Sequence, residues 1–120
     1  MAEFTLNVNM DCVDIDDMTR FWSAALGYEV SGELGPFRAL RDPDGVGPKV
    51  VLQRVADPTP GKNRLHLDLY VDALSALTPE VERLVGLGAR RAEDGWHELG
   101  DESWQVMHDP EGNVFCVCVH

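Results

Sequence analysis

Residues 65–71 read Leu-His-Leu-Asp-Leu-Tyr-Val, and residues 4–12 read Phe-Thr-Leu-Asn-Val-Asn-Met-Asp-Cys. In both stretches apolar and polar residues alternate one by one, which is the period of a strand with one buried face. Each stretch therefore predicts a β-strand, and the two strands lie in different halves of the chain.

A helical stretch follows each predicted strand. The apolar residues of the two stretches recur at helical spacing, and the stretches end at Gly27 and Gly88. Asp16 or Asp17 is expected to cap the first helix, and Thr78 is expected to cap the second.

A turn and an apolar strand complete each half. The turns are residues 42–45 (Asp-Pro-Asp-Gly) and 109–112 (Asp-Pro-Glu-Gly), and the strands are residues 50–55 and 114–119. Proline presets the first corner of such a turn and glycine permits its left-handed corner. The order of strand, helix and turn-linked strands thus occurs twice, which indicates an internal repeat.

The repeat divides a single domain, residues 1–120, into module 1–56, linker 57–61 and module 62–120. In each module one sheet face is covered by the helix and the other is open, so two modules can pair with their open faces around a cleft. By alternation, the residues expected on the open faces are Asn7, Asn9, Gln53, His66, Asp68, Tyr70 and Cys116.

Composition argues against several kinds of partner and location. The 120 residues include 21 acidic and 10 basic side chains, a formal net charge of −11, which disfavours nucleic acid and anionic membranes as partners. We find no signal-peptide pattern and no apolar run long enough for a bilayer. The three cysteines lack a CxxC spacing, so free thiols and a cytoplasmic location are expected.

Five motifs lie in order along the two halves. They are residues 14–22 (DIDDMTRFW), 25–30 (ALGYEV), 62–71 (KNRLHLDLYV), 87–91 (LGARR) and 109–116 (DPEGNVFC). The set resembles the glyoxalase-like domains of the vicinal oxygen chelate superfamily, which includes bleomycin-resistance proteins and extradiol dioxygenases. The resemblance covers nearly the whole chain. It implies an α+β fold in which two tandem βαβββ modules pair into a curved mixed sheet around a cleft, usually as a homodimer.

The resemblance also implies where a divalent metal would bind, namely on the first and last strands of each module. Those positions here are Asn7, Gln53, His66 and Cys116, and only His66 is of the usual ligand type. Amides are weak donors, and one imidazole with one thiolate falls short of the three or four ligands of zinc sites. Asp68, on the same strand face, can compensate. We therefore expect no metal cofactor; if zinc, iron, nickel or manganese binds, His66, Cys116 and Gln53 are its expected ligands.

Two tryptophans and one cysteine have alternative interpretations. Trp96 and Trp104 flank the polar residues 97–103, which are expected to form a flexible rim where aromatic rings contact flat ligands. The alternative is that both rings pack against the sheet. Cys116 is expected to be an inert buried thiol rather than a nucleophile, because the chain has a net charge of −11 and no matching Cys-His-Asn signature.

Two functions are favoured over a vestigial module. The first is a metal-independent binding protein that holds a small organic molecule on residues Asn7, Gln53, His66, Asp68, Tyr70, Trp96, Trp104 and Cys116. The alternative is a metal-dependent lyase, isomerase or dioxygenase in which His66 is a metal ligand or a general base. Bound metal would discriminate between them.

Overall fold

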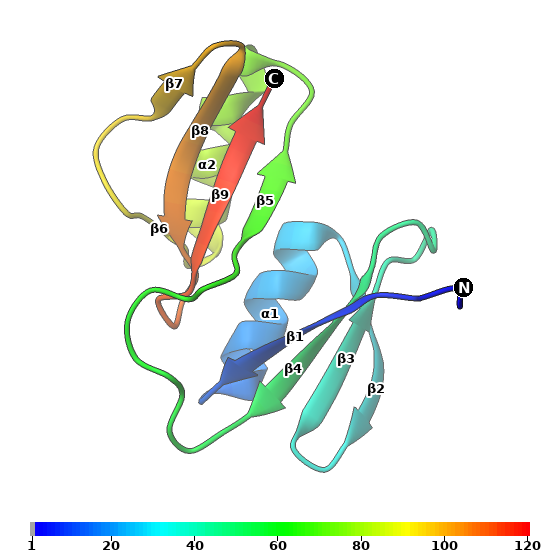
Figure 1. Cartoon of the computed structure of the whole chain (residues 1–120). Helices are drawn as coiled ribbons and strands as arrows, with labels where there is room; N and C mark the ends of the chain where they lie inside the picture. The colour runs from blue at the N-terminus through cyan, green and yellow to red at the C-terminus, as the bar shows by residue number, and fades with distance from the viewer. Residues whose placement is uncertain (1) are drawn as a thin grey trace. The chain divides into compact units, whose positions relative to one another are not determined.

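The computed structural model describes residues 2–120, which form two compact units that divide between Pro58 and Thr59. Each unit contains a mixed β-sheet with one helix packed on it (Figure 1). The α+β expectation is therefore confirmed: two mixed sheets and two helices are present. We call residues 2–58 the N-terminal unit and residues 59–120 the C-terminal unit.

The N-terminal unit has a four-stranded sheet in the order β1-β4-β3-β2. Strands β1 and β4 are parallel, and the other neighbours are antiparallel. Its apolar core includes Phe21, Trp22, Leu40 and Leu52, all at most 1% exposed. The elements are β1 (Asn7–Cys12), α1 (Ile15–Leu26), β2 (Glu29–Leu34), β3 (Phe37–Arg41) and β4 (Lys49–Arg54).

The C-terminal unit repeats this topology in the order β5-β9-β8-β6, with β7 added beside β8. Here β5 and β9 form the parallel pair. Leu77 and Leu84 of the helix are buried together with Phe115 of the central strand. The elements are β5 (Leu67–Tyr70), a 3₁₀ turn η1 (Leu74–Ala76), α2 (Leu77–Leu87), β6 (Arg90–Arg91), β7 (His97–Leu99), β8 (Glu102–His108) and β9 (Val114–Val119).

Both opening strands begin later than predicted. The first starts at Asn7, opposite Lys49 at the beginning of its partner strand, and Phe4 is 83% exposed. The second starts at Leu67, and Leu65 is 89% exposed. The expectation of strands from residues 4 and 65 is wrong because alternation shows what a strand would bury, whereas a strand also needs a partner to pair with.

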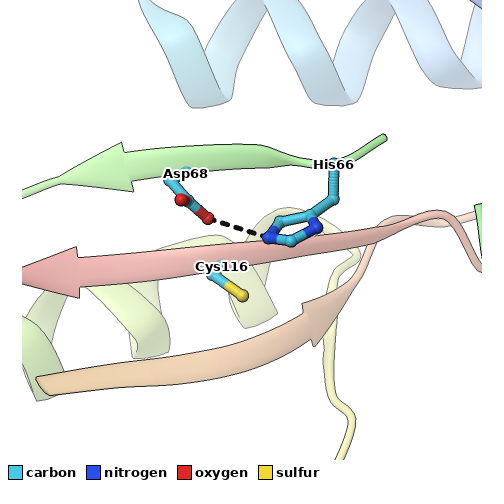
Figure 2. A group of neighbouring side chains, drawn as sticks. All are labelled: His66, Asp68 and Cys116. Atoms are coloured by element: carbon cyan, nitrogen blue, oxygen red, sulfur yellow. Dashed lines mark ion pairs between the residues drawn. The ribbon is translucent and has the colours of Figure 1, made fainter. Parts of the chain in front are cut away.

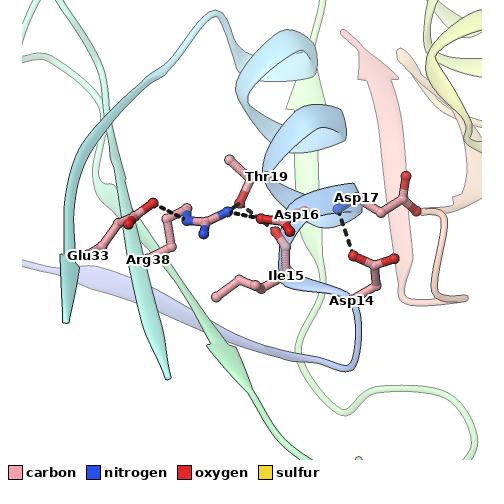
Figure 3. A network of polar contacts seen from close by, with 7 residues as sticks. All are labelled: Asp14, Ile15, Asp16, Asp17, Thr19, Glu33 and Arg38. Atoms are coloured by element: carbon pink, nitrogen blue, oxygen red, sulfur yellow. Dashed lines mark hydrogen bonds and ion pairs between the residues drawn. The ribbon is translucent and has the colours of Figure 1, made fainter. Parts of the chain in front are cut away.

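A network of acidic residues and one arginine fixes the start of α1 (Figure 3). The N-cap is Asp14, whose Oδ1 accepts a hydrogen bond from the backbone N–H of Asp17 at 3.0 Å, so the expected caps Asp16 and Asp17 are wrong. Asp16 Oδ1 instead accepts from Arg38 Nη1 at 2.7 Å, and Arg38 Nε lies 2.9 Å from Glu33 Oε1. The arginine therefore links the first turn of α1 to strands β2 and β3.

The second helix begins differently. It starts at Leu77 directly after η1, and its N-cap is Ala76, which makes no capping hydrogen bond. The expected cap Thr78 is therefore wrong: the 3₁₀ turn already delivers the chain in a helical conformation. The predicted helix ends are confirmed, since Gly27 (φ 67°) and Gly88 (φ 122°) are the C-caps.

The cysteine prediction is also confirmed, because Cys12, Cys116 and Cys118 are free and buried. Within residues 2–120, the helices are too short and too polar for a bilayer crossing.

Candidate functional site

Strand register brings the candidate residues of the C-terminal unit onto one face. The parallel pairing of β5 and β9 sets Asp68 opposite Cys116 and Tyr70 opposite Cys118. On the other side of β9, Trp104 pairs with Cys118. Because paired residues of neighbouring strands share a face, these side chains form one surface. It is the surface turned away from α2, since the intervening Gln105 lines a pocket with residues of α2.

Three side chains with metal-ligating atoms meet on this surface (Figure 2). His66 Nε2 lies 3.1 Å from Asp68 Oδ1, and a ligand atom each of His66, Asp68 and Cys116 lie within 4.8 Å of one another. The imidazole and the carboxylate are 36% and 45% exposed, whereas Cys116 is buried. Across residues 2–120 this is the one such group of three or more.

The thiols of this surface are held in their neutral form. Burial, and then the carboxylate of Asp68, raise the pKa of Cys116, while Lys62 acts in the opposite direction. The same two causes raise the pKa of Cys118 to about 12. An inert thiol at position 116 is therefore what the electrostatics favour in the absence of a bound cation.

The surface is hollowed into a depression of about 270 Å³. This volume is slightly below the range of about 300–1,000 Å³ that is usual for ligand pockets, so it suits a small ligand. Sequence reasoning missed Leu99, Glu102 and Cys118 as lining residues, although Cys118 and Glu102 lie two residues from the predicted Cys116 and Trp104 and thus share their face. The full lining is His66, Asp68, Tyr70, Leu99, Glu102, Trp104, Cys116 and Cys118.

Two stacked ring pairs border the depression. Tyr70 stacks on His120 with ring centroids 4.5 Å apart, and His120 Nδ1 lies 2.6 Å from Glu102 Oε1. Trp104 stacks on His97 at 5.4 Å. Residues 97–103, predicted as a rim, form the hairpin of β7 and β8 through the register of His97 with Trp104, and Leu99 and Glu102 of this hairpin line the depression.

The remaining predicted residues lie elsewhere. Trp96 lines a separate pocket of about 160 Å³ with Val81 of α2, and its Nε1 donates to Glu98 Oε1 at 3.1 Å. Asn7 and Gln53 belong to the N-terminal unit, where Asn7 is exposed and Gln53 is half-buried. The structure thus groups five of the eight predicted binding residues: His66, Asp68, Tyr70, Trp104 and Cys116.

The strand order that occurs in both units is the architecture expected of the family that the sequence motifs resemble. A protein-family model described as a glyoxalase-like domain matches residues 7–118. The chain belongs to this glyoxalase-like family, within the vicinal oxygen chelate superfamily that the sequence motifs resemble.

Solved structures support the same fold. A glyoxalase/bleomycin resistance protein/dioxygenase family enzyme from Burkholderia phytofirmans is 22% identical, with a TM-score of 0.79 over 94% of this chain and 95% of that chain. The genomically encoded fosfomycin resistance protein FosX from Listeria monocytogenes is 13% identical, with a TM-score of 0.80 over 100% and 95% of the two chains. At these identities the likeness shows the fold alone. A comparison with curated protein sequences finds no match.

Divalent metals are common in this superfamily, and the donor set here can be tested against them. An imidazole, a carboxylate and a thiol number three protein ligands, as in catalytic zinc sites that keep a fourth position open. The nitrogen and sulfur donors suit a zinc-like ion better than magnesium or calcium. His66, Asp68 and Cys116 thus fit such an ion. The third ligand is Asp68 of the C-terminal unit, whereas the sequence predicts Gln53 of the N-terminal unit in that place.

Proposed function

We propose that the C-terminal unit binds a small organic molecule in the open-face depression and that this binding needs no metal ion. The observation that supports it is the depression itself, about 270 Å³, with aromatic, apolar and polar side chains on one sheet face. A concave surface with a few convergent polar groups among apolar ones is the usual form of a ligand site.

The lining indicates the chemistry of the ligand. Asp68 and Glu102 contribute two carboxylates, and none of the lining residues is a lysine or arginine. Trp104, Tyr70 and Leu99 supply flat or apolar surface. We therefore expect a ligand with a flat apolar part and a hydrogen-bond donor or positive charge, and we expect anionic molecules to bind poorly.

His66 has a defined role in this proposal. Its Nε2 lies 3.1 Å from a carboxylate oxygen of Asp68. In the neutral imidazole Nε2 therefore carries the hydrogen and donates a hydrogen bond to Asp68. Nδ1 is then an acceptor for an N–H or O–H group of the ligand. Asp68 orients the imidazole, and the ligand meets the imidazole through the other nitrogen.

The test is titration calorimetry with two flat probes of opposite charge, 2-naphthylmethylammonium and 2-naphthoate, each with and without EDTA. We expect the ammonium to bind, EDTA to leave its Kd unchanged, and His66→Ala to weaken it about tenfold, as for the loss of one or two hydrogen bonds. His108→Gln is the matched control, because His108 bonds to the carbonyl of Gly112 and does not line the depression. Binding that disappears with EDTA would contradict metal independence.

A second candidate function is favoured by the three-residue cluster: a metal-dependent lyase, isomerase or dioxygenase. His66, Asp68 and Cys116 would hold the ion, which would polarise substrate oxygens and stabilise negative charge. Near one equivalent of zinc, iron, nickel or manganese per chain, measured by elemental mass spectrometry on protein purified without chelator, would favour this function. Metal far below stoichiometry, unchanged after ions are added back, would exclude it.

The family resemblance extends the proposal to assembly and location. We propose that the protein works as a homodimer in the cytoplasm. Light scattering on a size-exclusion column tests the first part, because a homodimer would elute at about twice the chain mass of 13.3 kDa.

A further inference from the structure

The side chain of Asn63 joins two segments that are distant in sequence. Its Oδ1 accepts a hydrogen bond from the backbone N–H of Val114 at 2.8 Å, and its Nδ2 donates to the carbonyl of Val114 at 3.0 Å. The same Nδ2 donates to the carbonyl of Leu65 at 2.5 Å. One side-chain amide therefore satisfies both backbone groups of Val114 and also holds the chain just before His66.

This arrangement replaces a step of the β-ladder. In a parallel pair, a neighbouring strand supplies both an acceptor and a donor to a residue, and a primary amide side chain supplies the same two groups. The backbone pairing of β5 and β9 begins at Leu67 with Phe115, one residue later. Asn63 thus attaches the chain to β9 before the first residue of β5, on the far side of His66 in the sequence.

The segment needs such an anchor. Leu65 is 89% exposed, so it contributes almost no buried apolar contact, and His66 lies outside the strand. Val114, in contrast, is 8% exposed and begins β9, two residues before Cys116. Fixing residues 63–65 to Val114 therefore fixes His66 against the strand that carries Cys116.

We propose that Asn63 is a positioning residue that holds His66 over Asp68 and Cys116 and so shapes the depression. The part that concerns ligand affinity rests on the proposed function; the part that concerns the place of His66 does not. Aspartate at position 63 would lack the N–H donors and alanine would lack both donor and acceptor, while serine has a single hydroxyl in place of the oxygen and the NH₂ group that make the three bonds.

The first test measures the position of His66 without any ligand. In the wild-type protein we expect nuclear Overhauser contacts between the imidazole protons of His66 and the β-protons of Cys116, assigned with His66→Gln. Asn63→Ala should abolish them while the cross-strand contacts of β5 with β9 persist. Asn113→Ala is the matched control: its amide donates to Asp109 Oδ2 at 2.9 Å beside Val114, so its loss should leave the His66 contacts intact.

Each outcome decides the proposal. Contacts that survive in Asn63→Ala would overturn it. If Asn63→Ala does not fold, Asn63→Asp decides, because it keeps the acceptor for the Val114 N–H and loses both donated bonds: loss of the His66 contacts in a folded sheet supports the proposal. Unchanged contacts, or a second unfolded protein, would show that Asn63 serves the fold instead and would overturn it.

The second test uses 2-naphthylmethylammonium and separates this inference from the proposed function. We expect Asn63→Ala to weaken its binding about tenfold and Asn113→Ala to change it by less than about twofold. If the wild-type protein does not bind the probe, the proposed function fails while the positioning role stands on the contacts. If the wild-type protein binds and Asn63→Ala binds equally, the ligand part of this inference fails.

Discussion

The two units share a topology and differ in what their open faces carry. The strand orders β1-β4-β3-β2 and β5-β9-β8-β6 correspond one to one. In the N-terminal unit the central strand β4 alternates between buried and less buried residues, whereas all six residues of β9 are buried. Gln53 of β4 is half-buried, while Cys116 of β9 is 6% exposed.

The difference lies in what surrounds the central strand. In the C-terminal unit, β7 adds a hairpin with β8, and the ring pairs of Tyr70 with His120 and Trp104 with His97 border the open face. The N-terminal unit has exposed Asn7 and Asn9 at the corresponding edge strand. Repeating a fold therefore does not repeat its chemistry: the scaffold is shared, and the site depends on a few added residues.

The largest expected effect is on the rate at which the buried thiols of the two units are alkylated. With a pKa of about 12 in place of 9.0, the thiolate fraction of Cys118 at pH 8 falls about a thousandfold, so its alkylation should be slower by a similar factor than in unfolded protein. Cys12 of the N-terminal unit is fully buried and should react only on unfolding. Iodoacetamide labelling followed by peptide mass spectrometry measures both rates. A ligand in the depression should slow the labelling of Cys116 and Cys118 and not that of Cys12; equal protection of all three would contradict a local site.

The two aspartate-proline turns offer the next contrast. Asp109 is fully buried and accepts hydrogen bonds from the backbone of Glu111 and Asn113 and from the side chain of Asn113. Its replacement by alanine should cost about 3 kcal/mol of unfolding free energy, because buried donors lose a charged partner. Asp42, in the equivalent turn, is more exposed, and Asp42→Ala should cost clearly less. Urea unfolding of both variants checks the order, and equal losses would contradict it.

The helix starts give a smaller contrast. Asp14→Ala should destabilise the protein by about 1 kcal/mol, since it removes the side-chain cap of α1. Ala76→Ser at the start of α2 should change stability by less than about 0.5 kcal/mol, because Ala76 already has helical backbone angles (φ −89°, ψ −12°) instead of the extended ones of a capping residue. Thermal unfolding of the two variants measures both effects. A clear gain in Ala76→Ser would show that α2 accepts an ordinary cap.

The smallest effect concerns acid pH. Hydrogen bonds from the backbone N–H groups of Gly47 and Asp44 lower the pKa of Asp42 in the folded protein. A lowered folded-state pKa means that Asp42 adds stability above its unfolded pKa, near pH 4, and that this stability is lost as pH falls through the lower folded value. Between pH 6 and pH 3 the wild-type protein should therefore lose slightly more stability than Asp42→Asn. Chemical unfolding across that range tests the sign; a larger loss in the variant would contradict it.

The local sequence pattern was enough to predict the repeat and to select several residues that the structure brings together on one sheet face. Alternation alone assigned His66, Asp68, Tyr70 and Cys116 to open sheet faces, and the register of β5 with β9 brings them together. Alternation could not show that Asp68 faces Cys116, because register between distant strands depends on pairing and not on either strand by itself.

Other features depend on contacts that the sequence pattern does not encode. Asp14, Asp16 and Asp17 are all suitable helix caps by residue type. In the structure Asp14 is the cap, Asp16 is bound by Arg38 from strand β3, and Asp17 pairs with Arg20. The sequence predicts Trp96 and Trp104 at the same ligand site because they flank one polar stretch, residues 97–103. The hairpin of β7 and β8 begins after Trp96 and leaves this ring in the pocket that α2 lines.

His66 and Cys116 lie on different kinds of backbone, and this difference has a consequence for hydrogen exchange. Cys116 belongs to β9, which is buried throughout and paired on both sides, whereas His66 lies on an irregular segment held by the side chain of Asn63. Amide protons of β9 should thus exchange only in large openings of the unit, and those of residues 64–66 in small local ones. A ligand that contacts both residues should therefore slow hydrogen exchange most at residues 64–66, where the openings are local.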